Sequence, residues 1–173
     1  RLLVVIFLLT NHFLLSGQAY QPFTESIQYL KSAVTPEEAT NRWRKLTSTH
    51  AVPLVVEDSV AFLYKGEATS VMWLGDFNDW GSREHYPKKG ERLGNTDLWI
   101  LKASFPKDAR LDYKIVINES NWILDPINPH QQWSGVGGGS PNSELRMPDW
   151  KEDSLTTSLL PGAQSGNLKK DIL

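Results

Sequence analysis

Two tryptophans, a lysine and an asparagine are the residues of this sequence whose types could bind a ligand. Trp80 ends residues 75–80, Lys114 lies on an alternating apolar stretch, Trp122 follows that stretch, and Asn142 follows a glycine-rich loop. Carbohydrate sites use such sets, because the apolar face of a hexose packs on an aromatic ring while lysine and amide groups bond to its hydroxyls. The residues alone slightly favour the alternative, in which Trp80 and Trp122 are partly buried sheet residues.

The sequence offers no comparable set of residues for catalysis. Without cysteine it lacks thiol nucleophiles, thiolate zinc sites and disulfides, and it has no Gly-x-Ser-x-Gly elbow to present a nucleophilic serine. No two of its four histidines have metal-ligand spacing. The glycine-rich residues 135–140 lack the Gly-Lys-Ser/Thr ending of a phosphate-binding loop. We therefore expect no catalytic residue, no metal ion and no cofactor in this chain.

Length and charge narrow the class of protein further. The chain has 173 residues, of which 40% are apolar, so one domain with a real core and some flanking sequence is expected. Its 18 Lys and Arg stand against 20 Asp and Glu, a net charge of −2. Nucleic-acid affinity depends mainly on basic residues that release counterions, so this balance argues against a nucleic-acid partner.

The first residues have the layout of a secretory signal. An apolar run, residues 2–9, is followed by a second short one at residues 13–15 and then by small residues at Gly17 and Ala19. We expect residues 1–19 to be a signal peptide cleaved after Ala19, and the mature protein to be secreted or periplasmic. The alternative is a buried or membrane-anchoring helix, which the polar interruption at Asn11 and His12 makes the poorer fit.

Residues 20–50 are expected to form a helical extension. Apolar residues spaced three and four apart predict a short helix over 23–31. Thr35 and Pro36 have the types found at an N-cap and at the first helical position, which predicts a second short helix running to about Leu46. On that helix Trp43 is expected to be a packing anchor against the next domain.

The spacing of apolar residues changes after residue 50 and predicts an all-β domain over residues 51–150. Short β-rich runs separated by turn residues are expected to be strands; they are 54–56, 59–64, 69–74, 98–105, 111–117 and a closing strand at 143–147. Strands at this spacing without intervening helices indicate an antiparallel sandwich. Alternation places Trp99 in its core and points Lys114 outward. Residues 151–173 are polar and are expected to be a linker.

Several separated motifs resemble one family of domains. They are Val71–Trp80, Leu98–Trp99, Tyr113–Val116 and Trp122–Pro126. Together they resemble the early-set immunoglobulin-like domain of the isoamylase N-terminal and AMP-activated kinase glycogen-binding type. The closer resemblance is to the version that precedes the catalytic domain of enterochelin-esterase-like esterases. In that group an Asp-Pro-x-Asn-Pro loop, a glycine cluster and a Pro-Asn-Ser-Glu-Leu segment recur, here at residues 125–129, 137–139 and 141–145.

The resemblance covers roughly residues 53–150 and implies an immunoglobulin-like (early-set) β-sandwich preceded by the two short helices. It also implies that Trp80, Lys114, Trp122 and Asn142 take the positions of the sugar site of the glycogen-binding relatives. Residues 166–172 resemble the entry to an α/β-hydrolase domain, so a C-terminal catalytic domain of the same chain is an implied partner. The sequence departs from the glycogen binders in a longer charged excursion at residues 85–94 and in residues 137–141.

Two functional hypotheses follow from the resemblance. In the first, the chain is the non-catalytic accessory domain of an exported serine esterase and helps to bind a polysaccharide, an oligosaccharide or another substrate. In the second, it is a structural or interaction module whose tryptophans pack on the catalytic domain or on a homodimer partner and bind no glycan.

Overall fold

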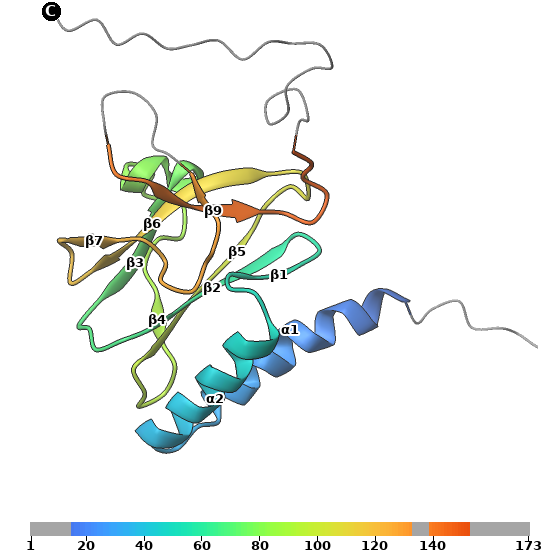
Figure 1. Cartoon of the computed structure of the whole chain (residues 1–173), viewed down its shortest axis with the longest axis vertical. Coiled ribbons are helices and arrows are strands. Elements are labelled where there is room, and N and C mark those ends of the chain that lie inside the picture. Colours follow the sequence, from blue (N-terminus) through green and yellow to red (C-terminus); the bar gives the residue numbers. More distant parts are fainter. Residues whose placement is uncertain (1–14, 133–138, 153–173) are drawn as a thin grey trace, which may run out of the picture.

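Two helices precede two β-sheets in this computed structural model, which describes residues 15–132 and 139–152 (Figure 1). The first helix, α1, spans Leu15–Lys31 and the second, α2, spans Pro36–Thr49. The predicted start of α2 is confirmed, because the side chain of Thr35 accepts a hydrogen bond from the backbone N–H of Glu38 at 3.1 Å. The helix continues past the expected end at Leu46.

The first helix is longer than the sequence pattern suggested. Because α1 begins at Leu15, it overlaps the end of the segment expected to be a signal peptide, while residues 1–14 lie outside the described residues. The signal peptide and its cleavage after Ala19 stay predictions. Among the described helices, none has the length and apolar character needed to cross a membrane.

One sheet, called sheet A here, contains four antiparallel strands. Its order is β1-β2-β5-β4, with β1 at Leu54–Val56, β2 at Ser59–Lys65, β4 at Glu91–Arg92 and β5 at Leu98–Ser104. The strands predicted at 54–56, 59–64 and 98–105 are thus confirmed to within a residue or so. The two-residue strand β4 was not predicted, because it is too short to show a period.

The other sheet, sheet B, is also antiparallel and contains the remaining strands. Its order is β3-β6-β9-β8, with β7 paired to β6; the strands are β3 at Val71–Gly75, β6 at Arg110–Ile117, β7 at Asn121–Ile123, β8 at Gln131–Gln132 and β9 at Asn142–Arg146. The predicted strands at 69–74, 111–117 and 143–147 are confirmed with small shifts, while the short β7 and β8 were missed. The two sheets make an all-β sandwich, as the sequence predicted.

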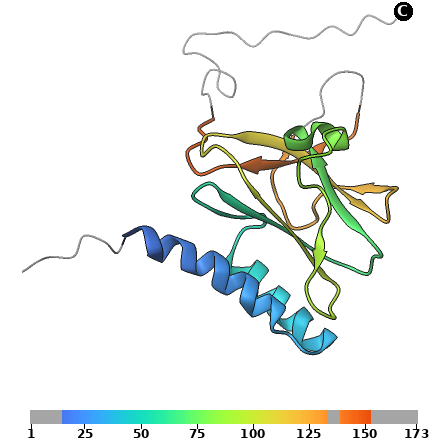
Figure 2. The ribbon, with the colours of Figure 1, turned by 180° about the vertical axis from the view of Figure 1, so that it is seen from behind.

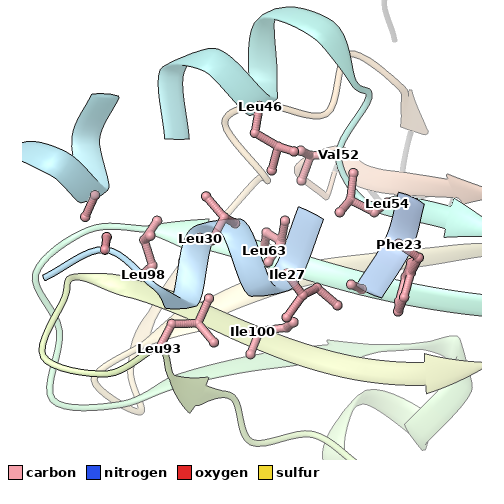
Figure 3. Close-up of a cluster of buried hydrophobic side chains, with 13 residues drawn as sticks. Phe23, Ile27, Leu30, Leu46, Val52, Leu54, Leu63, Leu93, Leu98 and Ile100 are labelled. Carbon is pink, nitrogen blue, oxygen red and sulfur yellow. The ribbon is translucent and has the colours of Figure 1, made fainter. Parts of the chain in front are cut away.

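Two clusters of buried apolar side chains divide the molecule into three layers. The first joins the helices to sheet A and includes Phe23, Ile27, Leu30, Leu46, Leu63, Leu98 and Ile100 (Figure 3). The second lies between the two sheets and includes Phe62, Trp73, Phe77, Trp99, Leu101, Tyr113 and Ile115. Sheet A is therefore covered on both faces, and the view from behind shows both helices lying along one side of the sandwich (Figure 2).

Two placements of tryptophans expected from the sequence, Trp99 in the core and Trp43 packed against the sandwich domain, are confirmed. Trp99 and Trp73 are buried between the sheets, and Trp43 packs partly buried against the helix–sheet cluster. Trp150 is half-buried after the last strand. Trp133 lies outside the described residues.

Candidate functional site

The register of sheet B brings one row of side chains to the face that points away from sheet A. Trp122 lies opposite Val116, and Val116 lies opposite Met72 on its other side. Lys114 lies opposite Leu74 and, two residues from Val116, shares its face. Directly opposed residues in an antiparallel pair have their side chains on the same face. We call this surface the outer face of sheet B.

Trp80 reaches the same face from a tight turn after β3. The turn is the short 3-10 helix η1, Asp76–Gly81, within which Trp80 has a left-handed backbone (φ 53°). Buried Asn78 fixes this turn: its side-chain oxygen accepts from the Gly75 N–H at 3.0 Å and its Nδ2 donates to the Trp73 carbonyl at 2.9 Å. A left-handed backbone at a bulky residue is strained and persists where surrounding contacts determine it.

The end of this turn lies on the outer face of sheet B. A Cβ placed on Gly81 would be 3.4 Å from the side chain of Leu74, which is the neighbour of Lys114 across the strands. Trp80 is therefore held close to the row that contains Lys114, with 37% of its surface exposed. Trp122, further along the face, is 47% exposed. These two are the exposed tryptophans of the described chain.

The side chains of Lys114 and Asn142 already have hydrogen-bond partners within the protein. The Lys114 ammonium donates to the Ser140 hydroxyl, and the Asn142 side chain, only 6% exposed, donates through Nδ2 to Asp112 at 3.3 Å. Asn142 lies on β9 on the same side as Glu144, which is paired with Asp112. The structure thus places Lys114, Trp122 and Asn142 on one side of sheet B, with Asn142 largely covered, and the turn that carries the exposed Trp80 packs against the same side at Leu74.

Acidic groups lie beside this row. The backbone N–H of Asp112 donates to Asp76 at 2.8 Å. Burial raises the pKa of Asp112, and the nearby carboxylates of Asp76 and Glu144 add to the rise, while the Asn142 hydrogen bond and Arg110 oppose it. Within residues 15–132 and 139–152, no group of His, Asp or Glu side chains is arranged to hold a metal ion.

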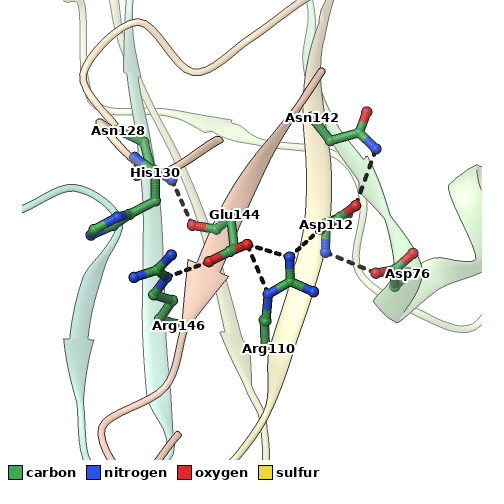
Figure 4. A network of polar contacts seen from close by, with 8 residues as sticks. All are labelled: Asp76, Arg110, Asp112, Asn128, His130, Asn142, Glu144 and Arg146. Atoms are coloured by element: carbon green, nitrogen blue, oxygen red, sulfur yellow. Dashed lines mark hydrogen bonds and ion pairs between the residues drawn. The ribbon is translucent and has the colours of Figure 1, made fainter. Parts of the chain in front are cut away.

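The buried carboxylate of Glu144 organises the next part of the face (Figure 4). Its side chain is 1% exposed and is shared by two guanidinium groups: Arg110 Nε donates to Oε2 at 2.8 Å, and Arg146 Nε donates to Oε1. Burial alone would raise the pKa of Glu144, but the hydrogen bonds from the two arginines lower it below its ordinary value. The Trp150 ring lies against both guanidinium groups, and its centroid is 4.8 Å from Cζ of Arg146 and 6.0 Å from Cζ of Arg110.

The Asp-Pro-x-Asn-Pro loop, used above only as a family motif, turns inward. Asp125 accepts from the Tyr113 hydroxyl at 2.8 Å and from the backbone N–H groups of Ile127 and Asn128. The Asn128 side chain donates to the Tyr113 hydroxyl at 3.0 Å and to the Glu144 carbonyl at 2.9 Å. Burial raises the pKa of Asp125, while the hydrogen bonds it accepts lower it. The loop therefore ties the sandwich core to β9; sequence reasoning had assigned it no such role.

Comparison with known proteins gives a likeness in fold. No protein-family model matches the chain, and no curated protein matches it significantly. Among solved structures, the ferric enterobactin esterase of Salmonella typhimurium superposes with a TM-score of 0.54 and 16% identity, over 72% of this chain and 40% of that one. The chain shares part of the fold of an enterobactin esterase.

Two further structures belong to the same group. The enterochelin esterase of Shigella flexneri gives a TM-score of 0.46 and 18% identity over 64% of this chain and 36% of that one. The Shigella flexneri enterobactin esterase in the presence of enterobactin gives a TM-score of 0.43 and 19% identity, over 54% of this chain and 31% of that one. The chain spans less than half the length of these esterases.

Proposed function

We propose that this chain is a non-catalytic accessory domain of an exported esterase and that the outer face of sheet B binds carbohydrate or the substrate of the parent enzyme. The observation that carries the proposal is the register of sheet B, which sets exposed Trp122 and the Lys114 side chain on one face beside the turn that holds Trp80. Two exposed rings near a cation offer stacking surface and a hydroxyl-binding donor. Lys114 takes the role of donor, and Asn142 positions Asp112 beside it.

The proposed binding is weak by itself. An aromatic contact contributes about 0.5–1.5 kcal/mol beyond the area it buries, and this face has two such rings. Attachment to a catalytic domain raises the local concentration of substrate, which makes a weak module effective. The shared fold with enterobactin esterases supports a C-terminal α/β-hydrolase domain as the attached partner. The apolar pattern of residues 2–19 supports a secreted or periplasmic location.

Titration followed by tryptophan fluorescence tests the binding. The ligands are soluble starch, xylan, their oligosaccharides and, because one neighbouring structure was determined in its presence, enterobactin. We expect a saturable change with at least one of them that is lost in the double variant Trp80→Ala/Trp122→Ala. The matched control is Tyr29→Ala, which removes a ring that is 37% exposed on α1, away from the sheets. Absence of any response, or an unchanged response in the double variant, would overturn the proposal.

A structural or interaction role is the second candidate function. The observation favouring it is that Lys114 and Asn142 are already engaged by Ser140 and Asp112, which leaves the two rings as the exposed part of the face. Exposed aromatic residues are common where a surface is covered by a partner. Sedimentation of this chain over a range of concentrations tests a homodimer. A dimer that Trp80→Ala/Trp122→Ala dissociates, together with no glycan response, would establish this role instead.

A further inference from the structure

A concave site lies at the open side between the two sheets. It is a cleft of about 290 Å³ whose lining comes from α1, the end of α2, the edge strand β1, the loop before β8, and β9. The lining includes Phe23, His50, Val52, His130, Glu144 and Arg146. This volume is at the lower end of the range of about 300–1,000 Å³ for ligand pockets, so it fits a small molecule. Trp80, Lys114, Trp122 and Asn142 are not among the lining residues, so the cleft is distinct from the face discussed above.

The lining has two chemically different sides. One is an apolar wall that includes Phe23, Val52 and Leu54, which also belong to the helix–sheet core. The other carries nitrogen-bearing side chains at His50, His130 and Arg146. A ligand that fits both sides has an apolar body and a polar or charged end.

The carboxylate in the lining does not compete for a cationic ligand. Both oxygens of Glu144 are occupied, Oε1 by Arg146 and Oε2 by Arg110, and the side chain is 1% exposed. Arg146 uses only its Nε in this pair, and within residues 15–132 and 139–152 its two terminal NH₂ groups have no hydrogen-bond partner. Its guanidinium plane is held by Glu144 and by the Trp150 ring at 4.8 Å. Figure 4 shows Arg146 and His130 on the same side of Glu144, opposite Arg110.

We propose that this cleft binds a small carboxylate with an apolar body, and that Arg146 receives the carboxylate through its terminal NH₂ groups. A planar guanidinium donates two parallel hydrogen bonds to a carboxylate, which is stronger and more selective than a contact with a point charge. His130 and His50 also line the cleft and bring imidazole nitrogens to it. The apolar wall of Phe23, Val52 and Leu54 takes the hydrocarbon part of the ligand.

Arg110 provides a matched control for Arg146. Both arginines donate to Glu144 and both lie over Trp150, but Arg110 does not line the cleft. Lysine at either position keeps the positive charge beside Glu144 and removes the two-pronged donor. A merely structural effect would thus be similar in Arg146→Lys and Arg110→Lys, whereas loss of a carboxylate receptor would appear in Arg146→Lys alone.

The test uses phenylacetate and its uncharged analogue phenylacetamide as probes of the whole chain. Binding is followed by NMR through the imidazole signals of His50 and His130, with His85, which does not line the cleft, as internal reference. We expect saturable shifts with phenylacetate, binding of phenylacetamide at least about tenfold weaker, a loss of about tenfold or more in Arg146→Lys, and little change in Arg110→Lys.

Two further variants keep the test decisive if Arg146→Lys perturbs folding. Ala51→Trp places a large side chain at an exposed position of the lining and is expected to abolish the phenylacetate shifts. Trp80→Ala/Trp122→Ala is expected to leave them unchanged, which separates this site from the outer face of sheet B. The proposal is overturned if phenylacetate gives no saturable shift, if phenylacetamide binds equally well, or if Arg146→Lys and Ala51→Trp bind like the parent.

Discussion

Sheet A and sheet B have the same antiparallel construction but different surroundings. Sheet A is covered by α1 and α2 on one face and by sheet B on the other, so consecutive residues of β2, Val60 to Leu63, are all buried. Sheet B packs one face on the core and presents charged and aromatic side chains on the other. We infer that sheet A, the middle layer, mainly supplies stability, whereas sheet B, which has a free face, can carry binding residues.

The outer face of sheet B is nevertheless not a plain solvent-exposed surface. Val116 and Leu74 on it are 1% and 7% exposed; the end of the Trp80 turn packs against Leu74, and Val116 lies opposite Trp122 of β7. Polar side chains near this layer are tied to one another, from Asn142 through Asp112 to Glu144 and its two arginines. A face with fixed polar groups is suited to positioning a ligand, since less side-chain entropy is lost on binding.

The largest expected effect lies in the helix–sheet layer. Leu30 on α1 is 0% exposed, and its replacement by alanine leaves a cavity against sheet A. Leu30→Ala is expected to lower the free energy of unfolding by about 2–5 kcal/mol, measured by urea denaturation. Val34→Ala, at a residue 85% exposed, is the control and should change stability by less than about 0.5 kcal/mol. Equal, small effects of both changes would show that the helices are not part of the folding unit.

The next effect concerns the loop that ties the core to sheet B. Removing the Asn128 side chain leaves the Glu144 carbonyl without its donor and the His130 N–H without its acceptor. A buried carbonyl left without a donor costs about 1–3 kcal/mol and the half-buried N–H adds less, so Asn128→Ala is expected to lower the free energy of unfolding by about 1–4 kcal/mol. Asn121→Ala, at an exposed residue of β7, is the matched control. A loss below 1 kcal/mol in Asn128→Ala would contradict the inward role of the loop.

A smaller and pH-dependent effect is expected at Glu144. Two arginines lower its pKa in the folded state, so its contribution to stability is fully present above its unfolded pKa and is lost as the pH falls through the lower, folded value. Glu144→Gln is expected to lower the free energy of unfolding by about 1–3 kcal/mol at pH 7 and by progressively less below pH ~4.5. Urea denaturation of both proteins between pH 7 and pH 3 gives this difference.

The comparison of variant with parent also separates the contribution of Glu144 from that of Asp125, whose pKa shift does not depend on Glu144. Asp125 has a raised pKa, so its titration favours folding towards lower pH, the opposite direction. Because Asp125 is present in both proteins, its part cancels in the difference. A stability gap between parent and Glu144→Gln that stays constant across this pH range would show that the charge of Glu144 is not what the two arginines stabilise.

The sequence predicted much of the two sheets because their longer strands alternate or carry β-branched residues. It predicted that the second helix packs on the next domain through Trp43, but not that both helices cover sheet A, since apolar residues on both faces of β2 indicate burial without naming the covering element. The outward direction of the Lys114 side chain could be predicted from the alternation of residues along β6. The burial of Asn142 and the pairing of two arginines with Glu144 could not be predicted, because both depend on contacts between segments far apart in the chain.

The smallest effect on stability is expected at the exposed rings of sheet B. Trp122 lies on the short strand β7 and is 47% exposed, so its removal exposes little of the core. Trp122→Ala is expected to lower the free energy of unfolding by less than about 1 kcal/mol, although a fully buried tryptophan costs about 3–5 kcal/mol. The same variant is expected to weaken glycan or substrate binding in the fluorescence titration. Large loss of stability with unchanged binding would place Trp122 with the covered residues, and sheet B would then resemble sheet A at that position.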